Sequence, residues 1–329
     1  MNNNLIVTNL VLPIAVCFIV TVILSKIFIP VLKSIKMGQK ILDIGPRWHK
    51  SKEGTPTMGG LFFIAPITVL GIVLALVTKQ YTLLIHTVFI FLNGCIGFVD
   101  DYVKFFKKQN AGLSPSQKMV LQFSAAAVYI FCLNLFGCID TSIAIPFTHI
   151  SFELHIAVYC VLAAVGIVFT VNSVNLTDGI DGLASSITAV VMIFMAVLGV
   201  KTANPDALVI SGCVIGGTLG FLVYNFHPAR VFMGDTGSLF LGAAVSSMAF
   251  MLNCPLLILF AGFMYYVESV SVIIQVTSYK LTKKRVFKMT PIHHHFEMSG
   301  WGEIKIVLVF SAVAAVLCAI GCFGFLPVL

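Results

Sequence analysis

Residues 81–106, YTLLIHTVFIFLNGCIGFVDDYVKFF, combine the two features that decide the fold of this chain. The stretch begins with an apolar run long enough to cross a lipid bilayer as a helix, which takes roughly 20 residues. The run ends at two adjacent carboxylates, Asp100 and Asp101, with Lys104 close behind them. Like charges repel each other unless a cation or a ligand compensates, so polar chemistry is expected at this membrane boundary.

The composition of the whole chain indicates a membrane protein. Only 10% of the 329 residues are charged and 59% are hydrophobic, and the mean hydropathy is +1.03. A soluble domain carries about a quarter charged residues, so soluble globular, fibrous and disordered proteins are excluded, and no soluble basic domain is left to bind nucleic acid. The nine cysteines lie in or near apolar segments without metal-ligand spacing, so we expect small buried side chains.

Ten apolar segments are candidates for membrane spans, so we predict an all-α polytopic membrane protein with ten transmembrane helices in one domain, residues 1–329. The segments are 8–31, 60–78, 82–100, 119–137, 155–172, 183–200, 207–224, 238–253, 256–278 and 304–327. The eighth segment is short, and Pro255 separates it from the ninth. The first is expected to be a retained helix, because no basic residue precedes it and no small-residue cleavage site follows.

The loops between these segments differ strongly in their lysine and arginine content. Alternate loops share a side of the membrane, and one set holds only Lys79 and Lys201. The other set holds Lys33, Lys36, Lys40, Arg47, Lys50, Lys52, Lys104, Lys107, Lys108, Lys118, Arg230, Lys280, Lys283, Lys284, Arg285 and Lys288. Basic loops stay on the cytoplasmic side, which puts both termini outside. The same surplus could also attract anionic lipid or a phosphorylated substrate.

The longest loop on the outer side, CIDTSIAIPFTHISFELHI at 138–156, alternates apolar and polar residues in two short runs. Such alternation predicts a small external β-hairpin. The polar chemistry lies on the opposite, cytoplasmic side. It is concentrated in DDYVK at 100–104, NSVNLTDGIDG at 172–182, NFHPARVFMGDTGS at 225–238 and PIHHHFE at 291–297.

Aspartates dominate two of these motifs. Asp178 and Asp181 are three residues apart, a spacing that a helical turn would bring to one face. The glycine after each of them instead favours an irregular backbone that a ligand approaches closely. Asp235 precedes the eighth segment, at a helix N-terminus that could hold phosphate. The alternative in both motifs is helix capping, by Asp181 in the first and by Asp235 or Ser238 in the second.

The carboxylates and histidines together predict phosphoryl chemistry. Carboxylates that share one pocket need a cation, and Mg²⁺ prefers hard oxygen ligands beside substrate phosphates. The three histidines lack the helical spacing of a zinc site; in an extended loop His293 and His295 would point the same way, and we favour contacts to diphosphate. Glu268 lies within the ninth segment, where an interhelical hydrogen bond and a functional role are equally open.

At these residues the sequence resembles the phospho-N-acetylmuramoyl-pentapeptide-transferase (MraY) family, within the polyprenyl-phosphate N-acetylhexosamine-1-phosphate transferase superfamily. The resemblance runs nearly end to end, through GTPTMGG at 54–60, FVDDYVK at 98–104, NLTDGIDGL at 175–183, NFHPARVFMGDTGS at 225–238 and PIHHHFE at 291–297. The aspartate motifs are shared across the superfamily, whereas GTPTMGG and PIHHHFE are more specific to this family. The resemblance implies ten transmembrane helices, a homodimer, and a bacterial cell membrane location with the active site facing the cytoplasm.

The reaction implied by the resemblance is the first membrane step of peptidoglycan synthesis. UDP-MurNAc-pentapeptide and undecaprenyl phosphate give lipid I and UMP, with Mg²⁺ as cofactor. The residues implied to be catalytic are Asp100, Asp101, Asp235, Lys118 and His294, with Asp235 also the metal ligand. Together with the motifs, the resemblance gives these expected substrate contacts: Lys52, Thr57, Lys104, Asn172, Asn175, Asp178, Gly179, Asp181, Asn225, Phe232, Gly234, Ser238, Gln275, His293 and His295.

In the expected chemistry the lipid phosphate attacks the β-phosphate of the nucleotide sugar, and charge develops on the departing UMP. Asp100 would deprotonate or orient the lipid phosphate, Asp101 would turn toward the nucleotide, and Phe232 would stack on uracil. A two-step route through an aspartyl-phosphate is the mechanistic alternative. The alternative functions are a related N-acetylglucosamine-1-phosphate transferase, which GTPTMGG and PIHHHFE disfavour, and a transporter, which the collection of polar motifs at one face disfavours.

Overall fold

The computed structural model describes residues 3–35, 52, 54–106 and 112–325. The N-terminal helix starts as α1 (Asn3–Ile6) and runs through a π-helical turn (Val7–Val11) into α2 (Leu12–Ser34). The helices that follow are α3 (Leu61–Thr78), α4 (Tyr81–Phe106), α5 (Pro115–Leu135), α6 (Ile156–Thr177), α7 (Leu183–Lys201), α8 (Pro205–Asn225) and α9 (Gly234–Met251). The C-terminal part contains a 3₁₀ turn (Pro255–Leu257), α10 (Ile258–Ala261), α11 (Phe263–Thr282), α12 (Ile292–Glu297) and α13 (Glu303–Phe325).

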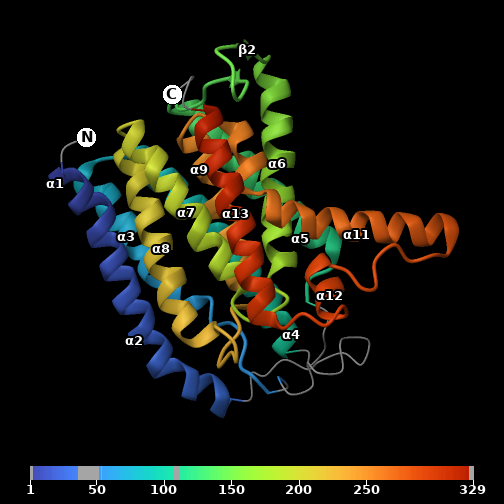
Figure 1. Ribbon diagram of the computed structural model, residues 1–329. Helices are drawn as coiled ribbons and strands as arrows, with labels where there is room; N and C mark the ends of the chain where they lie inside the picture. Colours follow the sequence, from blue (N-terminus) through green and yellow to red (C-terminus); the bar gives the residue numbers. More distant parts are fainter. Residues whose placement is uncertain (1–2, 36–51, 53, 107–111, 326–329) are drawn as a thin grey trace.

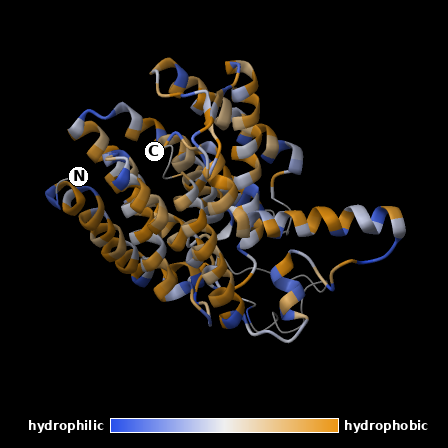
Figure 2. Ribbon diagram, turned by 45° about the horizontal axis from the view of Figure 1, so that its top comes forward, coloured by the Kyte–Doolittle hydropathy of each residue, from blue (hydrophilic) through white to orange (hydrophobic). Residues whose placement is uncertain are grey.

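The described residues confirm an all-α polytopic membrane protein. Eight of their helices are long and apolar enough to cross a bilayer, and the bent pair of residues 255–261 and α11 would make a ninth. The predicted segment 238–253 corresponds to α9, which is not among them and begins with the polar turn GDTGS. Hydrophobic residues run along the helices, and hydrophilic residues gather at helix ends and in connections (Figure 2). Several basic residues used for the orientation lie outside the described residues: Lys36, Lys40, Arg47, Lys50, Lys107 and Lys108.

The predicted ninth segment, 256–278, is not one straight span. The chain bends by 76° between residues 255–261 and α11, with the break at Gly262. Beyond the bend, α11 projects sideways from the bundle (Figure 1). The segment is apolar on both sides of the break, so its composition carried no sign of the change in direction.

The predicted hairpin is confirmed. Strand β1 (Ser142–Ala144) pairs antiparallel with β2 (Ser151–Glu153), and Ile143 lies opposite Phe152. The sheet, α1 and the C-terminal end of α13 lie toward the same end of the bundle (Figure 1). A backbone hydrogen bond of 2.6 Å from Phe147 N to Gly324 O joins the hairpin to α13.

Helix α9 forms the centre of the bundle. It is buried along nearly its whole length and packs between α4 and α6. Gly97 of α4 lies directly on the backbone of Asp235 and Thr236, where a Cβ atom would collide with the carbonyl group of Asp235. Small residues allow helix backbones to approach closely in membrane proteins. This contact brings the end of α4 against the start of α9.

Candidate active site

Three carboxylates meet where α4 ends and α9 begins. Asp100 and Asp101 lie near the end of α4, and Asp235 lies in the first turn of α9. One oxygen atom from each carboxylate lies within 4.8 Å of the other two. The side chains of Asp100 and Asp101 are 4% and 5% exposed, and that of Asp235 is 20% exposed. The structure therefore joins the carboxylates of two separate motifs, and we call these three residues the carboxylate cluster.

The carboxylate of Asp101 binds the first turn of α9. Its Oδ2 atom accepts hydrogen bonds from the backbone N–H of Thr236 at 2.9 Å and from the Thr236 hydroxyl at 2.7 Å, and Oδ1 accepts from the N–H of Asp235 at 3.2 Å. These N–H groups have no partner within their own helix, and negative charge is favourable beside them. The alternative that Asp235 or Ser238 caps this helix is therefore excluded, because the cap comes from α4. Gly234 lies beside the same carboxylate, with φ of 71°.

Asp235 is bound by side chains from three other helices. Its Oδ2 atom lies 2.8 Å from Nζ of Lys118 on α5 and 3.0 Å from Nζ of Lys104 on α4. Its Oδ1 atom accepts a hydrogen bond from Nδ2 of Asn175 on α6 at 2.9 Å. Lys104 also pairs with both α4 carboxylates, at 2.6 and 3.7 Å. These contacts place a positive charge among the three carboxylates, which reduces their mutual repulsion.

Asp100 shares Lys104 with its neighbour Asp101 but accepts a backbone N–H from a different segment. Its Oδ1 atom accepts the backbone N–H of Leu113 at 2.8 Å, and its Oδ2 atom pairs with Lys104. Adjacent residues of a helix point about 100° apart, so the two carboxylates face different neighbours, as the sequence predicted.

The amide of Asn175 extends the carboxylate cluster. It donates to the hydroxyl of Ser238 at 2.8 Å and accepts from Lys118 at 3.3 Å, so three predicted residues join the cluster. Asn172, a turn earlier on α6, does not reach it; its amide donates to Gln122 on α5 at 2.7 Å. Sequence reasoning missed Gln122, whose Nε2 atom is buried without a partner in the part of the chain that the structure describes.

Asp178 follows the end of α6 and lies near the carboxylate cluster. Within the described ranges no hydrogen bond or ion pair reaches its side chain. Burial raises the pKa of Asp178 well above its ordinary value, and the negative charges of Asp235, Asp101 and Asp181 raise it further. An unpaired carboxyl group in this position is free to meet a cation or a hydrogen-bond acceptor.

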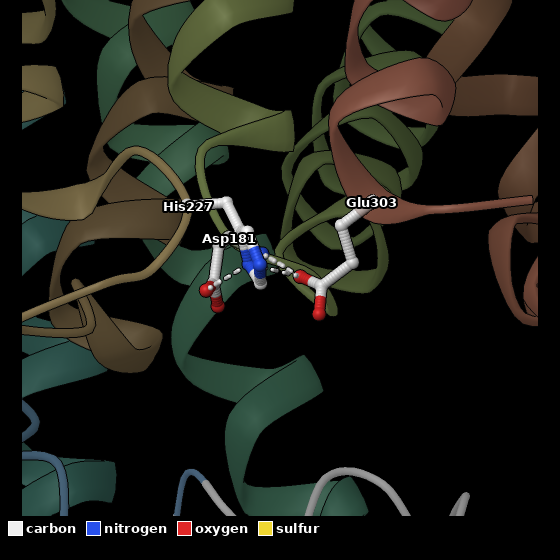
Figure 3. Close-up of side chains that lie close together, drawn as sticks. All are labelled: Asp181, His227 and Glu303. Atoms are coloured by element: carbon white, nitrogen blue, oxygen red, sulfur yellow. Dashed lines mark hydrogen bonds and ion pairs between the residues drawn. The ribbon is translucent and has the colours of Figure 1, made fainter.

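Asp181 points into a second cluster, which consists of Asp181, His227, Glu303 and Lys52. The Oδ1 atom of Asp181 pairs with Lys52 Nζ at 2.7 Å, and Oδ2 lies 3.0 Å from His227 Nδ1. Glu303, the first residue of α13, lies 2.7 Å from the same ammonium group through Oε2. Figure 3 shows Asp181, His227 and Glu303 converging from three separate segments. We call these four residues the Lys52 cluster.

The sequence anticipated only half of the Lys52 cluster. The backbone around Asp181 is an irregular turn, as its glycines predict, but Asp181 does not cap α7, whose N-cap is Gly182 without a side-chain cap bond. His227 was missed although it lies within a quoted motif. Glu303 was missed because a single acidic residue at the edge of an apolar span gives no sign of its distant partners.

The histidine motif forms the short helix α12, so the arrangement considered for an extended loop, with His293 and His295 pointing the same way, does not apply. The fully buried ring of His293 lies with Nδ1 3.1 Å from Oε2 of Glu268 on α11. His294 Nδ1 lies 2.6 Å from Oε2 of Glu297, and His295 Nδ1 accepts a backbone N–H at 3.1 Å. Glu268 therefore makes an interhelical contact with a residue of the motif.

The backbone of Gly179 lies against the ring of His293. A Cβ atom at residue 179 would collide with the Nε2 side of the imidazole. The predicted residues of two distant motifs thus meet directly, and the close approach explains the requirement for glycine.

Four further predicted residues lie outside both clusters. Thr57 lies beside the first residue of α9. Phe232 exchanges backbone hydrogen bonds of 2.8 and 2.9 Å with segment 56–59. Asn225 donates to a backbone carbonyl at 2.9 Å, and Gln275 binds backbone groups of the loop that follows α11. The amides of Asn225 and Gln275 thus hold loops in place, and the GTPTMGG segment is tied to the start of α9.

Comparisons with known proteins follow the same motifs. The family model for glycosyl transferase family 4 matches residues 83–253, and signature 1 of phospho-N-acetylmuramoyl-pentapeptide-transferase matches residues 52–64. The chain is 45% identical over 323 residues to the phospho-N-acetylmuramoyl-pentapeptide-transferase of Clostridium beijerinckii, covering 97% of both chains. It is 48% identical to that of Clostridium botulinum strain Alaska E43, covering 92% of this chain and 93% of the relative. The identity to that of Staphylococcus carnosus is 43%, covering 93% of this chain and 96% of the relative.

Proposed function

The chain belongs to the phospho-N-acetylmuramoyl-pentapeptide-transferase family, and we propose on that premise that its carboxylate cluster is the catalytic centre. The enzyme transfers phospho-MurNAc-pentapeptide to undecaprenyl phosphate and forms lipid I. The observation that carries the proposal is the convergence of three carboxylates with Lys104 and Lys118 at one point. Phosphoryl transfer depends mainly on positioning and on stabilisation of charge, which such a set of groups supplies.

The donor set of the carboxylate cluster fits Mg²⁺. Three carboxylates within 4.8 Å offer the hard oxygen ligands that this ion prefers. Asp101 and Asp100 accept backbone N–H groups, whereas the partners of Asp235 are side chains that can turn away, and Asp235 is the most exposed of the three. Asp235 would therefore be the main protein ligand. When bound, the ion supplies stabilisation for the charge on the departing UMP.

Each residue of the cluster has a distinct proposed role. Asp100 orients or deprotonates the phosphate of undecaprenyl phosphate, because it lies at the end of a membrane helix where a lipid head group arrives. Lys104 and Lys118 turn to phosphate oxygens during the reaction and offset the developing charge. Asp101 acts by holding the first turn of α9, and with it Asp235, in place. The lipid phosphate attacks directly; isotope exchange between UMP and the nucleotide sugar without the lipid acceptor would argue against direct attack and favour the aspartyl-phosphate route.

The Lys52 cluster and its surroundings are proposed to bind the nucleotide. Lys52 donates hydrogen bonds to the nucleotide of UDP-MurNAc-pentapeptide, and Phe232, which is tied to the GTPTMGG segment, stacks on uracil. Asp178 and His294 contact the diphosphate region. The bound amides of Asn225 and Gln275 support a role in shaping loops around the nucleotide.

We further propose ten membrane spans, with α9 as a short span and α10–α11 as a bent one. Both termini then lie outside and the catalytic centre faces the cytoplasm of a bacterial cell. Two observations support this topology: α1 and the end of α13 lie toward the same end of the bundle (Figure 1), and Lys52, Lys104 and Lys118 lie in the two clusters. The single domain, residues 1–329, works as a homodimer, which the mass of the purified enzyme in detergent would test.

The proposal is tested by measuring UMP release from UDP-MurNAc-pentapeptide with undecaprenyl phosphate and Mg²⁺. Asp100→Asn and Asp235→Asn should abolish release while the proteins stay folded. Glu153→Gln, an exposed carboxylate on β2, is the matched control and should leave the rate unchanged. Near-normal turnover in both aspartate variants would overturn the site assignment. Activity with UDP-N-acetylglucosamine as the donor, and none with UDP-MurNAc-pentapeptide, would instead identify the related transferase as the function.

A further inference from the structure

We infer that Glu303 is a positioning residue that holds the side chain of Lys52 for the nucleotide. The inference rests on the proposed nucleotide-binding role of Lys52. Glu303 lies outside the two matched regions, residues 52–64 and 83–253, and outside every motif quoted from the sequence. Its assignment comes from the contacts of its carboxylate alone.

Glu303 joins two functional segments that lie far from it in the chain. A single oxygen atom, Oε2, lies 2.7 Å from Nζ of Lys52 and accepts the backbone N–H of Asp181 at 3.0 Å. The ammonium group of Lys52 is thereby fixed between two carboxylates, since it also lies 2.7 Å from Asp181 Oδ1. The second carboxylate is itself anchored, because its Oδ2 atom accepts the N–H of Ala229 at 3.0 Å and lies 3.0 Å from His227 Nδ1.

The low exposure of these groups makes their contacts effective. The side chains of Lys52, Asp181 and Glu303 are 14%, 2% and 9% exposed. Exposed ion pairs contribute little to stability, whereas charge-assisted hydrogen bonds shielded from water are stronger. A lysine side chain is long and flexible, so two anchored carboxylates reduce the conformations that it must give up when the nucleotide binds.

Asp181, His227 and Glu303 also have the spacing of a cation site, and in this structure the cation between the two carboxylates is the ammonium group of Lys52. These three residues offer ligand atoms within 4.8 Å of one another. The ammonium group of Lys52 already pairs with both carboxylates, and every member of the cluster has a partner. The two carboxylates therefore hold the ammonium group of Lys52 in place, and in the proposed function the nucleotide contacts this ammonium group.

The test is a double-mutant cycle with steady-state kinetics for both substrates. Glu303→Ala should raise the KM for UDP-MurNAc-pentapeptide about tenfold, as expected for one lost charge-assisted bond. The KM for undecaprenyl phosphate and kcat should stay unchanged. Glu303→Gln still accepts the Asp181 N–H but has lost the charge, so it should raise the same KM by less. This variant replaces Glu303→Ala in the test if the alanine variant does not fold. Glu153→Ala on β2 is the control.

The cycle separates a positioning role from a general structural one. In a Lys52→Ala background, Glu303→Ala should raise the nucleotide KM no further, because residues that act as one unit are not additive. The inference would be overturned if the two substitutions had additive effects on the nucleotide KM. It would also be overturned if Glu303→Ala lowered kcat and raised both KM values together. An unchanged nucleotide KM in Lys52→Ala alone would instead refute the proposed role of Lys52.

Discussion

The adjacent aspartates of α4 should differ in what the same substitution does to stability. Asp101 accepts three hydrogen bonds from the first turn of α9, at 2.7, 2.9 and 3.2 Å. Asn would keep one acceptor oxygen and turn an NH₂ group toward an N–H donor. A hydrogen bond to a charged group contributes about 1.5–3 kcal/mol and a helix cap about 1 kcal/mol. We therefore expect Asp101→Asn to lower the free energy of unfolding by about 2–4 kcal/mol.

The same substitution at Asp100 should lower the free energy of unfolding much less. Asn can still accept the N–H of Leu113, and the other partner, Lys104, has a side chain that is 33% exposed. Ion pairs with that degree of solvent contact contribute about 0–1 kcal/mol. Asp100→Asn should therefore abolish UMP release with a loss of stability of about 1 kcal/mol or less.

Thermal unfolding of the purified variants in one detergent measures the difference. At about 2 °C per kcal/mol, Asp101→Asn should lower Tm by roughly 4–8 °C and Asp100→Asn by about 2 °C or less. Thr236→Val removes one of the three donors to Asp101 and should give an intermediate loss. Combined with Asp101→Asn it should add less than its own effect, because the two residues share a bond. Equal Tm values for the two aspartate variants, or additive losses, would refute the reasoning.

Four other predictions concern groups around the two clusters. Asp178→Asn should raise Tm at neutral pH, because the raised pKa of Asp178 means that its ionised form destabilises the folded state. The gain should vanish as the pH falls below about 4, where the carboxyl group is protonated in the unfolded chain as well, and a gain that persists there would contradict this cause. Glu268→Ala should lower Tm more than Glu268→Gln, which can still accept the buried N–H of His293; equal losses would argue against that bond. Gly179→Ala should lower kcat, because its Cβ meets the imidazole of His293; an unchanged rate would show that the ring yields freely. EDTA should stop UMP release and Mg²⁺ should restore it; release that persists in EDTA would exclude the metal.

Features that depend on local sequence were predicted well. The alternation within 138–156 became β1 and β2, with Ile143 opposite Phe152, because a period of two fixes which side chains share a face. The spacing of Asp100 and Lys104 by one helical turn likewise fixed their contact. In both cases the interacting residues lie within a short stretch, whose backbone geometry alone determines the result.

Features that depend on how distant segments meet were not predicted. The sequence left open whether Asp181 caps α7. In the structure its carboxylate pairs with Lys52, which lies 129 residues away in the chain, and its backbone N–H binds Glu303, which lies 122 residues away. The 76° bend before α11 was missed for a related reason: apolarity identifies a membrane segment but carries no information about its direction. The cap that Asp101 forms on α9 was not predicted either, because it depends on the close packing of α4 and α9 that Gly97 permits.

In the proposed function, the charges of the carboxylate cluster link nucleotide binding to Mg²⁺ binding. Three carboxylates there face two ammonium groups, those of Lys104 and Lys118, and both ammonium groups lie on the same oxygen of Asp235. An anionic nucleotide that approaches this point needs the lysines for its own phosphate oxygens. The lysines can turn away from Asp235 only if another cation takes their place, because three uncompensated carboxylates would repel both each other and the phosphates. Affinity for the nucleotide and affinity for Mg²⁺ should therefore be coupled through Asp235, and the coupling has to act equally in both directions.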